Sequence, residues 1–151
     1  YNEALEIFEE TIVSFPEADW KSSQGEFRPD AMSLHALQAL DFHLFSSDDT
    51  LETWTFRFTK HAWDIADWTD EATEMPERAE ILAYLQDLKS SVSYLLGNMT
   101  DSDLSKPCAT DGWFGKTLLG RLVYTLRHTT HHQGQLAILR HHAGEKKDTW
   151  R

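Results

Sequence analysis

The sequence has 151 residues, of which 40% are hydrophobic and 26% charged, and its net charge is −11. These values predict one globular domain over residues 1–151. The acidic balance argues against a nucleic-acid-binding protein, which needs a basic face, and against docking on anionic membranes. No apolar run is long enough to cross a bilayer, and no secretion signal is visible. The single cysteine, Cys108, excludes an internal disulfide and a multi-cysteine zinc site, so we expect a cytoplasmic protein.

The first two of four predicted helices lie in the N-terminal third of the chain. The first covers about residues 2–15, where apolar residues recur at three- and four-residue steps, and Pro16 breaks it. The second opens after Pro29, with Asp30 as its N-cap, and runs to about Phe45.

The other two helices are predicted in the second half of the chain. The third starts at Pro76, a favoured first-turn residue, and ends at Gly97. Its apolar positions alternate between four- and three-residue steps, as in the seam of a helix bundle: Ile81, Leu85, Leu88, Val92 and Leu95. The fourth covers about residues 114–142, is ended by Gly144, and is roughly 40 Å long at 1.5 Å per residue.

A long connection, residues 46–75, separates the second helix from the third. It is rich in tryptophan and threonine, and residues 53–60 alternate in a way that predicts an extended stretch. A connection of this length is usually a functional lid or contains a short helix of its own. Four helices with one long connection predict an all-α fold, a four-helix bundle.

The sharpest candidate for chemistry is the late sequence HTTHHQGQ. Because His128 and His132 are four residues apart on a helix, their side chains lie on one face, and two imidazoles can converge on one metal ion. A third ligand must then come from another helix. The candidates on the second helix are His35, His43 and Asp41, and periodicity does not decide between the two histidines.

The helix face that carries the histidine pair is polar along its length. Arg121, Thr125 and Gln135 continue it, where a core stripe would carry leucine or isoleucine. A polar stripe inside a bundle costs stability unless its groups are paired, so this face either turns to solvent or forms a site. The alternative interpretation is a plain helical interaction domain with solvated histidines, and the spacing alone does not separate the two.

The other histidines and the cysteine have ordinary explanations. His131 points about 100° away from the pair, towards solvent, and His141 and His142 lie at a helix end, where their charge complements the helix dipole. His61, in the long connection, is ambiguous, and Cys108 is interpreted as an inert thiol. Without Glu-x-x-His or His-Glu-x-x-His, neither a di-iron bundle nor a zincin-type protease is expected.

Together these residues resemble the DinB/YfiT-like metalloprotein superfamily. The resemblance rests on Ser-Leu-His-Ala-Leu around His35 and on His-x-x-x-His-Gln-Gly-Gln from His128. It implies an up-down-down-up bundle with a divalent metal ion held by His35, His128 and His132. His35 is preferred to His43 because the residues after it resemble those after the family's ligand. Gln133 is a departure, since many members carry arginine there.

The resemblance also implies a reaction class. Family members with assigned activities include transferases and isomerases that use low-molecular-weight thiols such as bacillithiol or mycothiol, and many members are dimers. The resemblance therefore implies a small-molecule substrate, a thiol partner and a homodimer. The alternative is a bundle protein of the stress-response type that binds metal without turnover.

Three neutral imidazoles around a divalent ion leave coordination positions open, which is typical of catalytic rather than structural sites. Zinc or nickel is expected, with iron as a further candidate, because ligand type alone does not choose among them. Zinc would lower the pKa of a water or thiol bound to it, so the reaction is expected to be thiol transfer or hydrolysis. Gln135 and Thr125 are expected to orient the ligands, and the aromatic connection to wall a substrate pocket.

Overall fold

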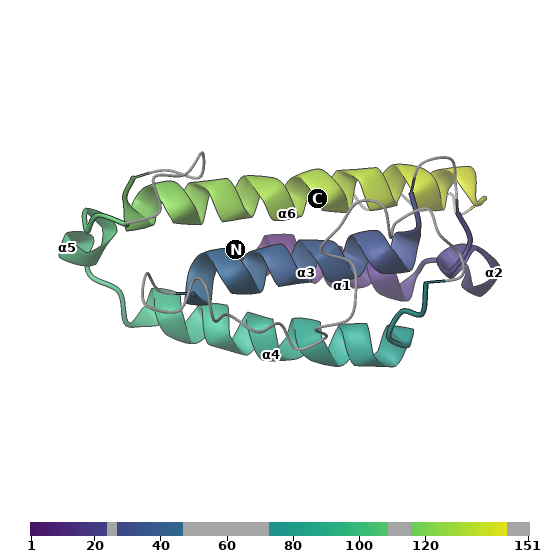
Figure 1. Ribbon diagram of the computed structural model, residues 1–151, viewed down its shortest axis with the longest axis horizontal. Helices are drawn as coiled ribbons and strands as arrows, with labels where there is room; N and C mark the ends of the chain where they lie inside the picture. Colours follow the sequence, from purple (N-terminus) through teal and green to yellow (C-terminus); the bar gives the residue numbers. More distant parts are fainter. Residues whose placement is uncertain (24–26, 47–72, 109–115, 145–151) are drawn as a thin grey trace.

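The computed structural model describes residues 1–23, 27–46, 73–108 and 116–144. These residues are mostly helical and contain no strand; an isolated bridge joins Pro107 to Thr117. Figure 1 shows four long helices and two short ones. They are α1 (Asn2–Val13), α2 (Glu17–Trp20), α3 (Pro29–Phe45), α4 (Arg78–Gly97), α5 (Asp101–Leu104) and α6 (Leu118–His142). The prediction of an all-α fold is confirmed.

Hydrogen bonds between α1 and α6 show that these two helices are parallel. The Tyr1 hydroxyl, at the start of α1, donates to the carbonyl oxygen of Leu122. At the other end, Nη1 of Arg140 donates to Oγ of Ser14 over 2.6 Å. The colours of Figure 1 show that α3 and α4 run in the opposite direction. Helix α6 therefore has the parallel α1 on one side and the antiparallel α3 on another.

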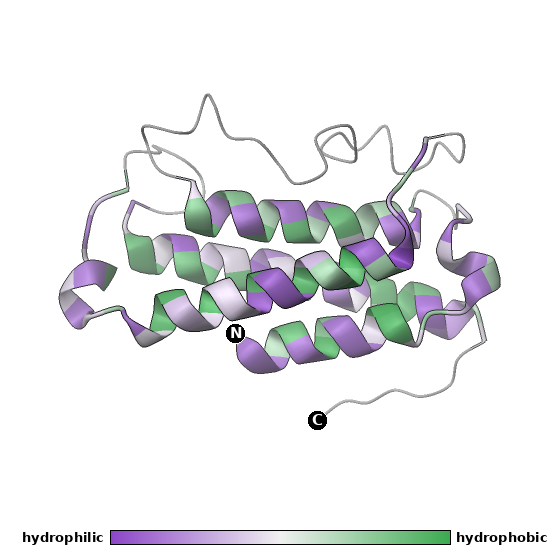
Figure 2. Ribbon diagram, turned by 90° about the horizontal axis from the view of Figure 1, so that it is seen from below, coloured by the Kyte–Doolittle hydropathy of each residue, from purple (hydrophilic) through white to green (hydrophobic). Residues whose placement is uncertain are grey.

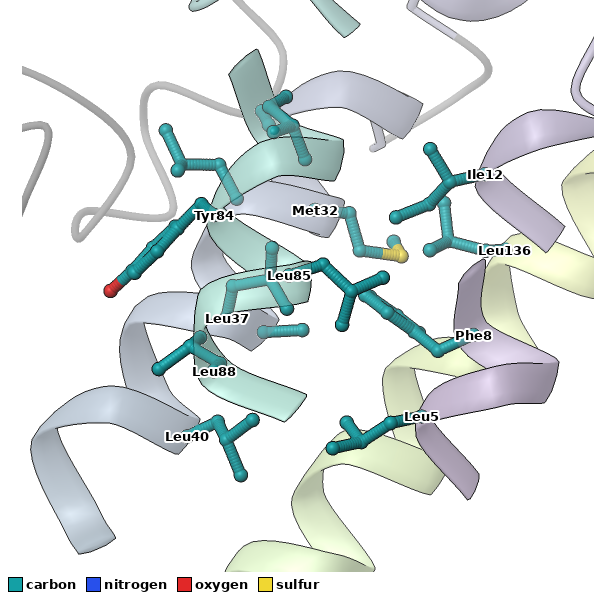
Figure 3. Packing of buried hydrophobic residues seen from close by; sticks show 14 of the residues in the cluster. Leu5, Phe8, Ile12, Met32, Leu37, Leu40, Tyr84, Leu85, Leu88 and Leu136 are labelled. Atoms are coloured by element: carbon teal, nitrogen blue, oxygen red, sulfur yellow. The ribbon is translucent and has the colours of Figure 1, made fainter. Parts of the chain in front are cut away.

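The long helices pack around one apolar core. In α1 the buried apolar side chains are Leu5, Phe8 and Ile12, at the spacing that the sequence predicts. Figure 3 shows Phe8 and Ile12 near Met32 and Leu136, and Leu5 pointing towards Leu40. In α4 the predicted seam is buried at four positions, namely Ile81, Leu85, Leu88 and Val92. Hydrophilic and hydrophobic positions alternate along the helices (Figure 2), and in α1, α4 and α6 many of the hydrophilic ones are exposed.

Helix α3 lies deepest in the bundle. It packs against α2, α4 and α6, so nearly every side chain along it is buried. Among those side chains are polar ones, including Gln38 and His43. A buried polar group costs stability unless it is hydrogen-bonded, so the buried polar residues of α3 require hydrogen-bond partners.

The start of α3 differs from the prediction. Arg28, not Asp30, is the N-cap residue, and Pro29 is the first residue of the helix. The Asp30 carboxylate accepts hydrogen bonds from Nε and Nη2 of Arg28, at 3.0 and 2.7 Å, and from the backbone N–H of Ala31, at 2.8 Å. Asp30 is therefore occupied by a buried ion pair with Arg28 (side chains 0% and 2% exposed) instead of capping the helix.

Other helix ends also shift by a few residues. Helix α4 begins at Arg78 and not at Pro76, because Glu77 and Glu80 form a capping box that sets the first turn. Helix α1 ends at Val13, two residues earlier than predicted. The short helices α2 and α5 were not predicted, since four residues are too few to show a period.

Some predictions lie outside the described residues. These are the extended stretch at 53–60, the side chain of His61 and the start of the fourth helix at residue 114. Among the residues that are described, none of the helices is both long enough and apolar enough to cross a membrane.

Candidate metal centre

Three histidines from two helices meet where α3 packs against α6. The ring centroids of His128 and His132, one turn apart on α6, are 4.5 Å apart. His35 of α3 reaches both of them, with its ring centroid 5.3 Å from that of His128 and 5.1 Å from that of His132. One ring nitrogen from each residue lies within 4.8 Å of the others, a spacing at which all three can bind one ion.

The nitrogen atoms of the α6 pair have the separation that a shared ligand requires. Nε2 of His128 lies 3.3 Å from Nε2 of His132. Two zinc-bound nitrogens at ~2.0–2.1 Å, with a tetrahedral angle between them, lie about 3.3–3.4 Å apart. Two unprotonated nitrogens this close repel each other unless a proton or a cation lies between them. The residues present therefore fit a divalent metal ion.

Gln135 sets the orientation of one of these rings. Nδ1 of His132 lies 2.8 Å from Oε1 of Gln135, and it is the donor because the amide oxygen can only accept. A proton on Nδ1 leaves the lone pair of the neutral ring on Nε2, the atom that faces His128. This is the arrangement by which a hydrogen bond on the outer nitrogen orients a metal-binding histidine.

Burial keeps both α6 histidines neutral. Desolvation, followed by the neighbouring His35 and His43, lowers the pKa of His128 from 6.5 to about 4. Desolvation likewise lowers the pKa of His132 to about 4, with His128 adding to the effect and the hydrogen bond to Gln135 opposing it. Metal binding requires unprotonated imidazole, so at neutral pH these side chains are already in the form that binds.

His43 does not join the cluster. It is buried, but its ring lies against Tyr124, with 5.0 Å between centroids, and 6.4 Å from the ring of His128. The reason is the register of α3 on α6: His43 lies eight residues beyond His35, about 12 Å along the helix. Asp41 is also outside the cluster, since its carboxylate accepts a hydrogen bond from the Tyr84 hydroxyl of α4.

Thr125 contacts its own helix and the start of α1. Its hydroxyl donates to the carbonyl oxygen of Arg121 over 2.7 Å, and its side chain also lies beside the Tyr1 hydroxyl. A threonine inside a helix commonly bonds back to the carbonyl four residues earlier. Thr125 therefore links α6 to the start of α1, and its expected role in orienting the histidines stays a prediction.

Sequence reasoning missed the contribution of Tyr124. Its ring stacks on His128, with centroids 5.9 Å apart and an angle of 29° between the planes. Its position four residues before His128 was a signal that it shares the histidine face. The predictions for the histidines away from the cluster are confirmed where the structure describes them, since His131, His141 and His142 are exposed.

A separate cavity of about 700 Å³ lies between the ends of α3, α4 and α6. Its walls include Phe45, Leu95, Met99 and Leu118, and none of the three clustered histidines lines it. It is therefore not the pocket of the candidate metal centre. The aromatic wall that was expected from the long connection lies largely outside the described residues.

Comparison with known proteins supports the resemblance seen in the sequence. The model of a family described as the DinB superfamily matches residues 3–136. The matched segment contains α3, α6 as far as Leu136, and all three clustered histidines. A comparison with curated proteins finds no match.

Proposed function

We propose, from the premise that this chain belongs to the DinB superfamily, that it is a metal-dependent enzyme that acts on a small molecule. The observation that carries the proposal is the convergence of His35, His128 and His132, whose ligand atoms lie within 4.8 Å of one another. Three imidazoles fill fewer positions than a divalent ion offers, so substrate can reach the ion directly.

The chain's own residues prepare this centre in three ways. His35, from α3, and the α6 pair supply three neutral nitrogen ligands. Gln135 fixes the ring of His132, so that Nε2 faces the site. Burial of the α6 pair keeps the ligands unprotonated at neutral pH. A divalent ion bound there supplies Lewis-acid chemistry, which favours the loss of a proton from water or from a thiol.

The reaction that we propose is thiol transfer or hydrolysis. An all-imidazole ligand set suits zinc, nickel or iron, and zinc or nickel is our first choice. A low-molecular-weight thiol is the co-substrate that we propose for transfer, because a thiol loses its proton more readily than water does. A cytoplasmic homodimer belongs to the same proposal, from the resemblance to the family.

Elemental analysis of protein purified without a histidine tag tests the proposal. We expect about one divalent ion per chain in the parent protein, and loss of that ion in H128A and H132A. H131A is the matched control, because His131 is an exposed imidazole beside His132 on the same helix. Unchanged metal content in H128A and H132A, or a loss in H131A of the same size, would overturn the assignment.

A further inference from the structure

Arg121 is a buried cation on α6 whose charge has no carboxylate partner among the described residues. It is 6% exposed. Its Nη2 donates to the carbonyl oxygen and to Oγ of Ser46, over 3.3 and 3.2 Å. Its buried Nε has no hydrogen-bond partner. The contacts that hold the guanidinium are thus two long hydrogen bonds to neutral oxygens.

The other end of the bundle shows how this chain treats a buried arginine that serves structure alone. Arg28 is 2% exposed, and its guanidinium makes two hydrogen bonds to the Asp30 carboxylate. This two-pronged pairing compensates the cost of taking the charge out of water. Arg121 is buried to a similar degree without such a partner, so its charge requires another explanation.

Nearby helix ends offset the charge of Arg121 only in part. Ser46 caps the C-terminal end of α3, where the helix dipole provides roughly half of a negative charge. Arg121 itself lies in the first turn of α6, where the dipole is positive. Among the described residues a net positive charge therefore remains at this point, and an anion would neutralise it.

Arg121 shares its helix face with the candidate metal centre. It precedes His128 by seven residues, about 10 Å at 1.5 Å per residue. His43 lies near both, because its ring centroid is 6.4 Å from that of His128 and it precedes by three residues Ser46, to which Arg121 donates. This separation along α6 is one that a single molecule of modest size can span.

We propose that Arg121 binds an anionic group of the substrate, so that the metal centre acts on a small carboxylate or phosphate. The fork of N–H donors on a guanidinium matches the oxygens of both groups. This inference rests on the proposed function, since it names the class of substrate for that centre. Arg121 holds the anionic end about 10 Å along α6 from His128, where it positions the molecule and takes no part in the chemical step.

Thermal unfolding with simple probes tests the inference. Parent protein and variants are melted with sodium acetate, with sodium phosphate and with neutral acetamide, at constant chloride concentration. Each is measured both metal-loaded and after chelator treatment, because an anion can also bind to a metal ion. The variants are R121M and R121Q, and K116Q is the control that removes one exposed positive charge close to the same helix.

We expect an anion at ten times its Kd to raise the melting temperature of the parent and of K116Q by about 3–5 °C. This rise should be lost in R121M and R121Q, persist after chelation and be absent with acetamide. A larger rise with acetate identifies a carboxylate, and a larger rise with phosphate identifies a phosphate. R121Q keeps a donor for Ser46, so it provides the test even if R121M does not fold.

Two results would overturn the inference. One is an equal anion-induced rise in the parent and in R121Q, and the other is no rise in the parent at all. Metal content, measured on the same samples, distinguishes a wrong substrate class from a wrong proposed function. If the parent and R121Q bind metal equally but show no Arg121-dependent rise, only the substrate class is wrong. If the parent binds no metal, the proposed function itself fails, and the substrate class fails with it.

Discussion

His128 and His132 bring their Nε2 atoms to 3.3 Å from each other on the face of α6 that meets α3. One helical turn separates the two residues, so the spacing in the sequence already places both rings on one side. The third imidazole, from His35, comes from the antiparallel neighbour. The site therefore depends on the packing of two helices and not on a local motif alone.

Gln135 should strengthen metal binding without touching the metal. In Q135A the Nδ1 proton of His132 loses its acceptor, and we expect metal affinity to fall about 10- to 100-fold. Competition with a fluorescent chelator measures the change. Q135E, which keeps an acceptor at this position, should bind at least as tightly as the parent. Equal affinity in Q135A and the parent would show that the hydrogen bond does not matter.

The metal-free protein should lose stability in mild acid. Burial, followed by the charge of Arg121, lowers the pKa of His43 from 6.5 to about 4. As the pH falls, His43 therefore takes up a proton in the unfolded state before it does so in the folded state. The contribution of neutral His43 to the free energy of unfolding is complete above about pH 6.5 and is lost as the pH falls towards 4. We expect His43 to contribute on the order of 2–3 kcal/mol to this loss.

Urea unfolding at pH 7 and at pH 5, after chelator treatment, measures this loss. H43F cannot take up a proton, so its free energy of unfolding should fall less between the two pH values than that of the parent. H131F is the control, since His131 is exposed. The explanation fails if the parent and H43F respond equally to acid.

The ion pair at the start of α3 should matter more than the ion pairs on the surface. In D30N the buried guanidinium of Arg28 loses its carboxylate, and we expect a loss of about 3–5 kcal/mol in the free energy of unfolding. K21A removes an exposed partner of Glu77 and should cost no more than about 1 kcal/mol. Chemical denaturation measures both, and equal losses would contradict the account.

Much of the fold follows from short-range patterns in the sequence. The steps between Leu5, Phe8 and Ile12 predict the buried face of α1, because helical spacing alone determines which side chains share a face. The same reasoning places His128 and His132 together. Helix ends were less accurate, as at Asp30, whose carboxylate could cap a helix or pair with Arg28. In the buried ion pair the Asp30 carboxylate accepts hydrogen bonds from two N–H groups of Arg28 and from the backbone N–H of Ala31 at the same time.

The residues that come from a second helix could not be predicted with the same certainty. His35 and His43 both lie on α3, and both are compatible with a buried position. The choice between them depends on how far α3 is displaced along α6, which is a property of the packed core and not of either helix. The resemblance to the DinB superfamily selected His35, and the geometry places that ring beside the α6 pair.

The most direct test of the central claim compares the metal content of H35A and H43A, both purified without a tag. His35 lies in the cluster and His43 lies outside it, although both are imidazoles on the same helix. We predict that H35A loses the divalent ion and that H43A retains about one ion per chain. Metal retained at the parental level in H35A, or lost only in H43A, would contradict the claim that His35, His128 and His132 bind one ion.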